Sequence, residues 1–372
     1  MKNLRSLFLG LTVIMGMQSS LFSQLDNVSF LEVGKGNIKD AEALFEKYLT
    51  PYANIFGANL NSGWYNSAKP HKLGGFDLTL TFNTAWAPPV DRTFDASKLV
   101  LGEGANLLPN SEGTFISPTI AGKLDAASPK LEYSMPINNV PVTFAEFELP
   151  KGTGVNMIPL PMAQLTIGLP FGTDVSVRYL PTLPLGEAGE IGLWGVGGRH
   201  SIIQHIPALK KLPIIDITAQ GGYTKLTTTA NIDYQPTNLV AADHVLVTNA
   251  NQFADQKLQM TASAWTVNLI FSETLPVISF YQGIGVSNSV VELGVNGKYP
   301  FPSIATSGEF AGEIVVTDND LITDPIQLEM KNDMALRLNA GLRLKLGVLT
   351  IQFDYTKANY SVFTTGLGIS FR

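Results

Sequence analysis

Residues 162–180 read MAQLTIGLPFGTDVSVRYL and contain two stretches of alternating polarity on either side of a tight turn. Leu165 and Ile167 alternate with polar residues before the turn, and Val175 and Val177 do so after it. A period of two is typical of a β-strand, and the Pro-Phe-Gly break predicts a hairpin. The alternation fits two opposite folds, because a soluble sandwich buries the aliphatic face whereas a membrane barrel turns that face toward lipid.

The composition excludes several classes of function. Charged residues make up 15% of the 372 residues, against about 25% in an ordinary soluble domain. The formal net charge is −6, which argues against a nucleic-acid partner. The sequence contains no cysteine, so disulfides, thiolate metal sites and cysteine nucleophiles are excluded.

The N-terminus has the layout of a secretory signal peptide. Lys2 and Arg5 precede an apolar run at 7–17, and Ser23 ends a stretch that fits a cleavage site. The run is shorter than the roughly 20 residues that span a bilayer, and an N-terminal membrane anchor is the alternative. No later stretch is apolar enough for a membrane helix, so a mature chain that enters a membrane must form a closed barrel.

A helix is predicted before the first strand. Apolar residues recur at helical spacing from Asn37, which can cap the start, and Pro51 sets the end. The apolar face of Leu44, Phe45 and Tyr48 needs cover, so we expect the helix to plug the lumen or to lie against the periplasmic mouth. The predicted organisation is a signal peptide at 1–23, a helix and plug segment at 24–70, and a barrel at 71–372.

Ten stretches with strand character follow. Several have about the ten residues that a tilted membrane strand needs, more than the five or six of a sandwich strand. An even count suits a bacterial barrel, and further hairpins within 88–161 or 288–331 would raise the count to twelve or fourteen. The ten candidates are 76–86, 162–170, 173–181, 190–204, 214–225, 257–271, 276–287, 333–346, 348–357 and 360–371.

The connections and the aromatic residues also favour a transmembrane β-barrel over the soluble alternative. Short turns at 170–172, 205–213, 272–276 and 347 alternate with long loops at 88–161, 226–256 and 288–331, as periplasmic turns alternate with outer loops. If the turns are periplasmic, aromatic residues gather at both strand ends, as membrane interfaces favour. The outer set is Trp86, Tyr179, Tyr223, Tyr355 and Phe363, and the inner set is Phe76, Phe271 and Phe371.

Two segments resemble a known group of proteins. GANLNSGWYNSAKPHKLGGFDLTL at 57–80 and LPFGTDVSVRYLP at 169–181 are similar to an uncharacterised family of Gram-negative outer-membrane barrels, distantly like the long-chain fatty-acid transporters. Those transporters have an N-terminal plug and more strands than are counted here. The resemblance implies outer-membrane localisation and transport of a hydrophobic solute. It also implies that the assembly machinery recognises Val362–Phe371, although Arg372 after the aromatic residue departs from the commonest ending.

Signals for enzyme chemistry are weak. The histidines, His71, His200, His205 and His244, form no metal-spaced pair, and no nucleophile elbow or phosphate loop occurs. His200 and Ser201 are adjacent on a strand and must point to opposite faces. We therefore predict no enzymatic activity, cofactor or metal, and an outer-membrane hydrolase is the weakest alternative.

The stretch TDNDLITDPIQLE at 317–329 has some features of a calcium loop. Asp318, Asp320, Asp324 and Glu329 fall at ligand positions of such a loop, but Thr323 replaces the required glycine. A solvated surface loop is the expectation, with a calcium site as the alternative.

The polar strand faces would line the barrel lumen. They would form a solute path or a hydrogen-bonded filler. We predict a channel or transporter for a small solute, with a hydrophobic one among the candidates; the alternative is a non-transporting surface barrel whose outer loops bind partners. Membrane lipid, the assembly machinery and the solute are the expected partners. The candidate lumen residues are Asp77, Asp174, Arg178, Asp216, Arg337, Arg343, Lys345 and Asp354.

Overall fold

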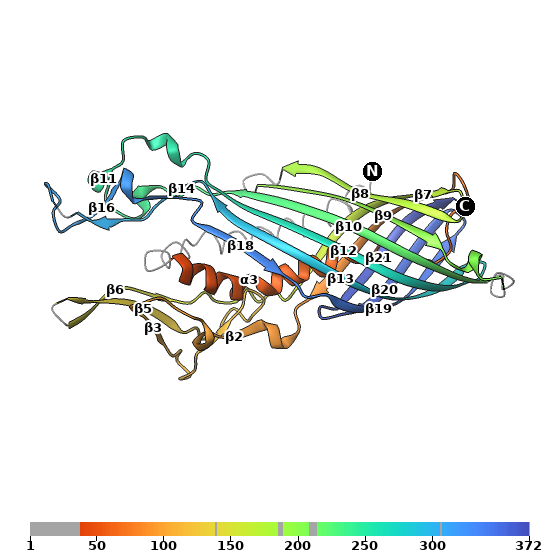
Figure 1. Ribbon diagram of the computed structural model, residues 1–372, viewed down its shortest axis with the longest axis horizontal. Helices are drawn as coiled ribbons and strands as arrows, with labels where there is room; N and C mark the ends of the chain where they lie inside the picture. The colour runs from red at the N-terminus through yellow and green to blue at the C-terminus, as the bar shows by residue number, and fades with distance from the viewer. Residues whose placement is uncertain (1–37, 138–139, 185–188, 208–213, 306, 372) are drawn as a thin grey trace.

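The computed structural model describes residues 38–137, 140–184, 189–207, 214–305 and 307–371. Within these residues the chain forms a β-barrel, one helix at its long-loop end and smaller sheets beside that helix (Figure 1). The predicted signal peptide at 1–23 and the start of the 24–70 segment lie outside the described residues. No helix of the described chain is long and apolar enough to cross a membrane.

The barrel is a closed antiparallel ring of ten strands, as predicted. Its first and last strands pair with each other, from Phe76 opposite Phe371 to Ala85 opposite Val362. In chain order the strands are β1 (Phe76–Trp86), β7 (Met157–Leu169), β8 (Thr173–Pro184), β9 (Glu190–Ser201), β10 (Ile215–Asn231), β12 (Lys257–Thr274), β13 (Ile278–Asn296), β19 (Ala335–Leu346), β20 (Leu349–Lys357) and β21 (Val362–Phe371).

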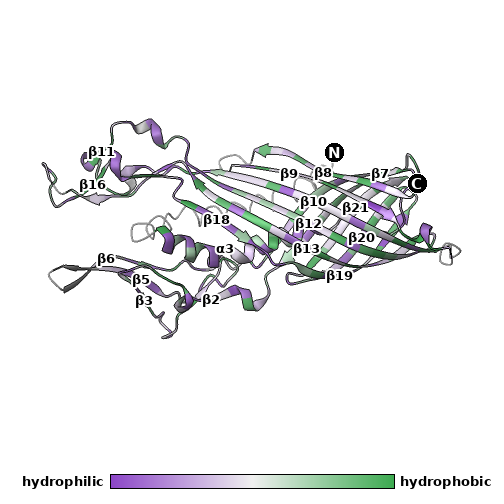
Figure 2. Ribbon diagram, in the orientation of Figure 1, coloured by the Kyte–Doolittle hydropathy of each residue, from purple (hydrophilic) through white to green (hydrophobic). Residues whose placement is uncertain are grey.

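The apolar face of the β7–β8 hairpin points outward and its polar face points into the barrel, as in a membrane barrel. Leu165 and Val177 are exposed on the outside, where lipid would cover them. Gln164, Asp174 and Arg178 are buried on the inside. Hydrophobic and hydrophilic residues alternate along the neighbouring strands in the same way (Figure 2). A soluble sandwich is therefore excluded.

Aromatic side chains mark the two edges of the apolar belt. Trp86 stacks on Tyr355 at the long-loop end, with ring centroids 6.0 Å apart. Phe76 lies beside Phe371 at the short-turn end, at 5.0 Å. Trp194, which the sequence analysis did not assign to either edge, joins the first set next to Tyr223 at 5.5 Å. These rings define the interfaces at which an outer-membrane barrel meets water.

Strand β12 reverses its polarity where it leaves the belt. On the membrane side of Trp265, Val267 and Leu269 point outward and are exposed. On the other side, Leu258 and Ala262 point inward and are buried. One half of this strand thus gives its apolar residues to lipid, and the other half gives them to the helix at the long-loop end, because the surroundings of the strand change along its length.

This reversal leads to a testable difference between two positions of β12. We expect Leu269→Arg to lower the free energy of unfolding by about 2–4 kcal/mol, because the charge would lie in hydrocarbon. Thr261→Arg, on the water-facing part of the same strand face, should change it by less than about 0.5 kcal/mol. Denaturant titration of both variants in lipid vesicles measures the difference; equal effects would contradict this placement of the belt.

All three long loops predicted from the sequence are partly strand; in the one predicted at 88–161, barrel strand β7 already begins at Met157. Strand β13 continues to Asn296, and β18 (Ile326–Lys331) pairs with its outer half. Ile326, Leu328 and Met330 are buried and alternate with exposed residues. The prediction that 288–331 is loop was therefore wrong, and so was the loop assigned to 226–231, which belongs to β10. These outer strands exist because they pack against the helix, a contact that sequence patterns do not reveal.

The helix α3 (Ile38–Leu60) extends past the predicted end at Pro51. An internal proline costs a helix about 3 kcal/mol. Here the turns after Pro51 bury Ile55, Phe56 and Leu60, which offsets that cost. The helix lies at the long-loop end with its last turn in the barrel mouth (Figure 1). The predicted periplasmic placement was therefore wrong, and the predicted plug role does not fit the greater part of the helix, which lies outside the mouth.

The long segment between β1 and β7 folds beside the helix. Its hairpin of β5 (Lys130–Ile137) and β6 (Val140–Glu148) stands outside the barrel, with β3 (Ala105–Leu108) on one edge. The hydroxyl of Tyr133 donates to the carboxylate of Asp40 at the start of α3, at 2.6 Å. The other short strands are β2 (Thr93–Asp95), β4 (Ile116–Pro118), β11 (Val245–Leu246), β14 (Lys298–Pro300), β15 (Ser303–Ile304), β16 (Ile314–Thr317) and β17 (Leu321–Thr323).

Candidate functional site: the plugged lumen

Residues 61–75, here called the luminal segment, run through the barrel from the end of α3 to the start of β1. At the long-loop end, the Asn61 side chain donates to the carbonyl of Asn288 at 3.1 Å. Midway, the amide of Ala68 donates to Ser272 Oγ at 3.0 Å. At the short-turn end, the amide of Gly74 donates to the carbonyl of Gly168 at 3.1 Å. The segment has no helix or strand of its own.

Two arginines of the barrel wall cap the C-terminus of α3. Arg178 Nη1 donates to the carbonyl of Leu60 at 2.8 Å, and its Nη2 donates to that of Ser62 at 2.7 Å. Arg337 Nη1 donates to the carbonyl of Asn61 at 2.7 Å. The last carbonyls of a helix have no partner within it, and the helix dipole makes this end negative. The wall arginines therefore add to the local cap, in which Ser62 donates to the carbonyls of Ala58 and Asn59.

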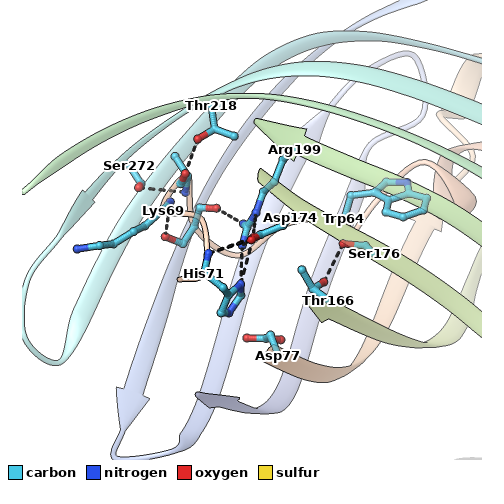
Figure 3. A network of polar contacts seen from close by, with 12 residues as sticks. Trp64, Lys69, His71, Asp77, Thr166, Asp174, Ser176, Arg199, Thr218 and Ser272 are labelled. Atoms are coloured by element: carbon cyan, nitrogen blue, oxygen red, sulfur yellow. Dashed lines mark hydrogen bonds and ion pairs between the residues drawn. The ribbon is translucent and has the colours of Figure 1, made fainter. Parts of the chain in front are cut away.

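A second group of contacts centres on Asp174. Its carboxylate accepts from the amide and Nδ1 of His71, both at 3.0 Å, and from Arg199 Nε at 2.7 Å. Arg199 Nη1 also donates to the carbonyl of Ser67 at 2.6 Å. Figure 3 shows His71 and Arg199 pointing at Asp174 from either side of it. This cluster binds the half of the luminal segment nearer the short turns to β8 and β9.

The remaining buried charges are held mainly within the wall. Arg343 Nη2 lies 3.1 Å from Asp77 Oδ2. Asp354 accepts from the hydroxyl of Tyr281 at 3.0 Å and from the Asn339 side chain at 2.8 Å. Both groups join strands of the ring to one another, and the Arg343–Asp77 pair does so across β20 and β21, so they stiffen the wall rather than fasten the luminal segment.

Glycines leave space in the wall for the aromatic residues of the luminal segment. A Cβ built on Gly222 would lie 2.5 Å from the indole of Trp64, and one on Gly197 would lie 2.6 Å from it. The guanidinium of Arg178 lies over the ring of Trp64, 3.6 Å from its centroid, at a distance suited to a cation–π interaction. The Gly-rich character of β9 and β10 is therefore the shape complement of Trp64.

Little free volume remains around the luminal segment. The cavity between its aromatic residues and the wall has about 10 Å³, which is the space of about one water molecule. Trp64, His71 and Arg199 are among its lining residues. Among the described residues, this part of the lumen has no room for a larger solute.

Six of the eight predicted lumen residues are buried and hydrogen-bonded inside the barrel. These are Asp77, Asp174, Arg178, Arg337, Arg343 and Asp354. Asp216 and Lys345 are half-buried near the short-turn ends of β10 and β19. The predicted plug residues Leu44, Phe45 and Tyr48 are buried, but they lie in α3 outside the barrel mouth, and residues 61–75 fill the lumen itself.

Sequence reasoning missed two residues of the Asp174 cluster. Arg199 follows the alternation of its strand, and that position predicts a lumen-facing side chain. His71 belongs to a stretch without periodicity, so no sequence signal places it beside Asp174. His200, predicted to be a strand-end histidine, has its Nδ1 2.8 Å from Thr173 Oγ1 at the short-turn end.

The acidic residues of the calcium-like stretch bind separate partners. Asp318 accepts from the hydroxyl of Thr248 at 2.7 Å, Asp320 accepts from the amide of Thr317 at 2.7 Å, and Asp324 accepts from the amide of Gly297 at 2.7 Å. In the part of the chain that the structure describes, no three His, Cys, Asp or Glu side chains converge on a metal position.

A pocket of about 530 Å³, here called the outer pocket, opens above the luminal segment. It lies between α3, β13, β19 and the turn from β20 to β21. Its volume falls in the usual range for small-molecule sites. Arg337 and Asn61 line it, so the pocket reaches the bond that joins the wall to the start of the luminal segment.

A model for a family of unknown function, DUF6588, matches residues 1–371. The chain belongs to this family. Together with the closed barrel, the apolar belt and the aromatic edges, this establishes an outer-membrane β-barrel protein, and we expect its short turns to lie in the periplasm. No curated protein matches in sequence.

Several solved outer-membrane proteins are similar in structure to this member of DUF6588. The protease OmpT from Escherichia coli has 7% identity and a TM-score of 0.30, covering 80% of this chain and 97% of that one. The attachment invasion locus protein Ail of Yersinia pestis has 9% identity and a TM-score of 0.24, and the match covers 80% of this chain and 100% of that one. The Pseudomonas putida toluene transporter TodX has 6% identity and a TM-score of 0.25, and the match covers 80% of this chain and 89% of that one. Such values say nothing about activity, and the likeness to fatty-acid transporters stays a prediction.

Proposed function

We propose that the protein is an outer-membrane transporter in which displacement of the luminal segment opens a path for a small water-soluble solute. The observation that carries this proposal is the way the segment is held. Polar groups of the wall bind its backbone carbonyls and His71. Each such bond has an ionised partner and contributes about 1.5–3 kcal/mol net. Water or a polar solute can replace these bonds when the segment leaves, because the wall groups that make them are polar.

The outer pocket supports the proposal because it connects solute binding to the closed lumen. Arg337 lines the pocket and also donates to the carbonyl of Asn61. A solute that engages Arg337 competes with that bond and weakens one attachment of the luminal segment. The charged wall behind the segment favours a polar solute over the hydrophobic one that the resemblance implies.

A matched pair of glycine variants tests the proposal. Gly222→Leu would place a side chain against the indole of Trp64, and such overpacking costs about 1–3 kcal/mol. We expect the open population to rise about ten- to a hundredfold, measured as conductance in planar bilayers. Gly221→Leu is the control, because the nearest atom to its Cβ is 3.8 Å away, and it should behave as the wild type.

Heat-modifiable migration in gel electrophoresis shows whether each variant forms a barrel. If Gly222→Leu is folded but conducts no more than Gly221→Leu, the gating proposal fails. The result would then favour a non-transporting surface barrel, for which the filled lumen and the elaborate outer sheets are also suitable.

A further inference from the structure

The partners of the buried arginines differ in kind. Arg199 is paired with Asp174, and Arg343 is paired with Asp77. All four of these residues belong to wall strands, so both pairs survive when the luminal segment moves. The wall itself neutralises these two guanidinium groups.

Arg178 and Arg337 have no such carboxylate in their hydrogen bonds. Arg178 donates to the carbonyls of Leu60 and Ser62 and to the side chain of Gln164. Arg337 donates to the carbonyl of Asn61 and to Ser62 Oγ. The two buried positive charges are therefore balanced by the negative end of the α3 dipole, in the place that a bound anion could take.

Displacement of the luminal segment would remove most of these acceptors at once. The described wall then presents four buried arginines and three buried aspartates, namely Arg178, Arg199, Arg337, Arg343, Asp77, Asp174 and Asp354. Asp354 is the one aspartate outside the two ion pairs; its hydrogen bonds go to Tyr281 and Asn339, and it attracts Arg337 electrostatically without a hydrogen bond. One aspartate for two guanidinium groups leaves an excess of positive charge. The groups left without acceptors are therefore cationic.

We propose that Arg178 and Arg337 form an oxyanion site, and that the transported solute carries a carboxylate or phosphate group. This inference rests on the proposed function and names its substrate class. The planar guanidinium fork matches both kinds of oxyanion. The helix carbonyls occupy the site in the closed state, and an anion arriving through the outer pocket meets Arg337 first.

Ion selectivity of the opened barrel tests the proposal. In a KCl gradient across a planar bilayer, Gly222→Leu should pass chloride about tenfold better than potassium, since rings of positive side chains select anions. Arg337→Gln in the same background should lose this preference, and Arg337→Lys should keep most of it. Arg92→Gln, which changes an arginine bonded to the outer carbonyl of Ala87, is the control and should keep it entirely.

Two added anions distinguish the sources of the oxyanion. Block of the chloride current by inorganic phosphate alone indicates a phosphorylated solute, and block by succinate alone indicates a carboxylate. Cation preference, or absence of block by both, overturns the oxyanion site while leaving the transport proposal standing.

A second measurement does not need an open lumen. Phosphate or succinate, compared with sodium chloride at equal ionic strength, should raise the Tm of the wild type more than that of Arg337→Gln. If the variants conduct nothing and neither anion raises the wild-type Tm, both the transport proposal and the anion site are overturned. A Tm increase without conductance retains the site as a binding site only.

Discussion

A cysteine introduced at Glu46→Cys should react with a membrane-impermeant maleimide on intact cells, almost to completion. Glu46 is exposed on α3, and α3 lies at the long-loop end of the barrel. Long loops of outer-membrane barrels face the cell exterior, so the helix is on the outside although it precedes every strand in the chain. The natural sequence has no cysteine, which leaves the introduced thiol as the single target.

Lys72→Cys is the matched control for this experiment. Lys72 is exposed at the periplasmic end of the luminal segment, only 26 positions later in the chain. It should react only after the outer membrane is permeabilised. Labelling of position 72 but not of position 46 on intact cells would show that the helix is periplasmic and that the direction of the luminal segment is reversed.

Asp174→Ala is expected to be the most destabilising single change in the lumen. The carboxylate is fully buried and accepts from His71 and Arg199. Its removal leaves the Arg199 charge buried without a counterion, and breaking a buried pair in this way costs about 3–5 kcal/mol. Denaturant titration in detergent micelles measures the loss.

The double variant Asp174→Ala, Arg199→Met provides the internal control. Because it removes both charges, it should recover a large part of the loss. Asp125→Ala, at an exposed position, should change the free energy of unfolding by less than about 0.5 kcal/mol. A double variant no more stable than Asp174→Ala would mean that the Arg199 charge is not the source of the loss.

The sequence alone determined the barrel, ten of its candidate strands and the direction of its faces, and the structure excluded the alternatives of twelve and fourteen strands. These features are local, because the period of two places every second residue on one face. Leu165 and Val177 outside, with Gln164 and Arg178 inside, follow from that period once the apolar face is given to lipid. The same rule located six of the eight charged residues predicted inside the lumen.

The tertiary structure alone decided what fills that lumen. Arg178 finds its acceptors on Leu60 and Ser62, more than a hundred residues away in sequence, and Arg337 finds Asn61 at a separation of 276. The helix continues past Pro51, and β12 reverses its polarity beyond Trp265, because α3 and the outer half of β12 pack against each other. Such contacts carry no periodicity, so only the folded molecule shows that residues 61–75 close the barrel.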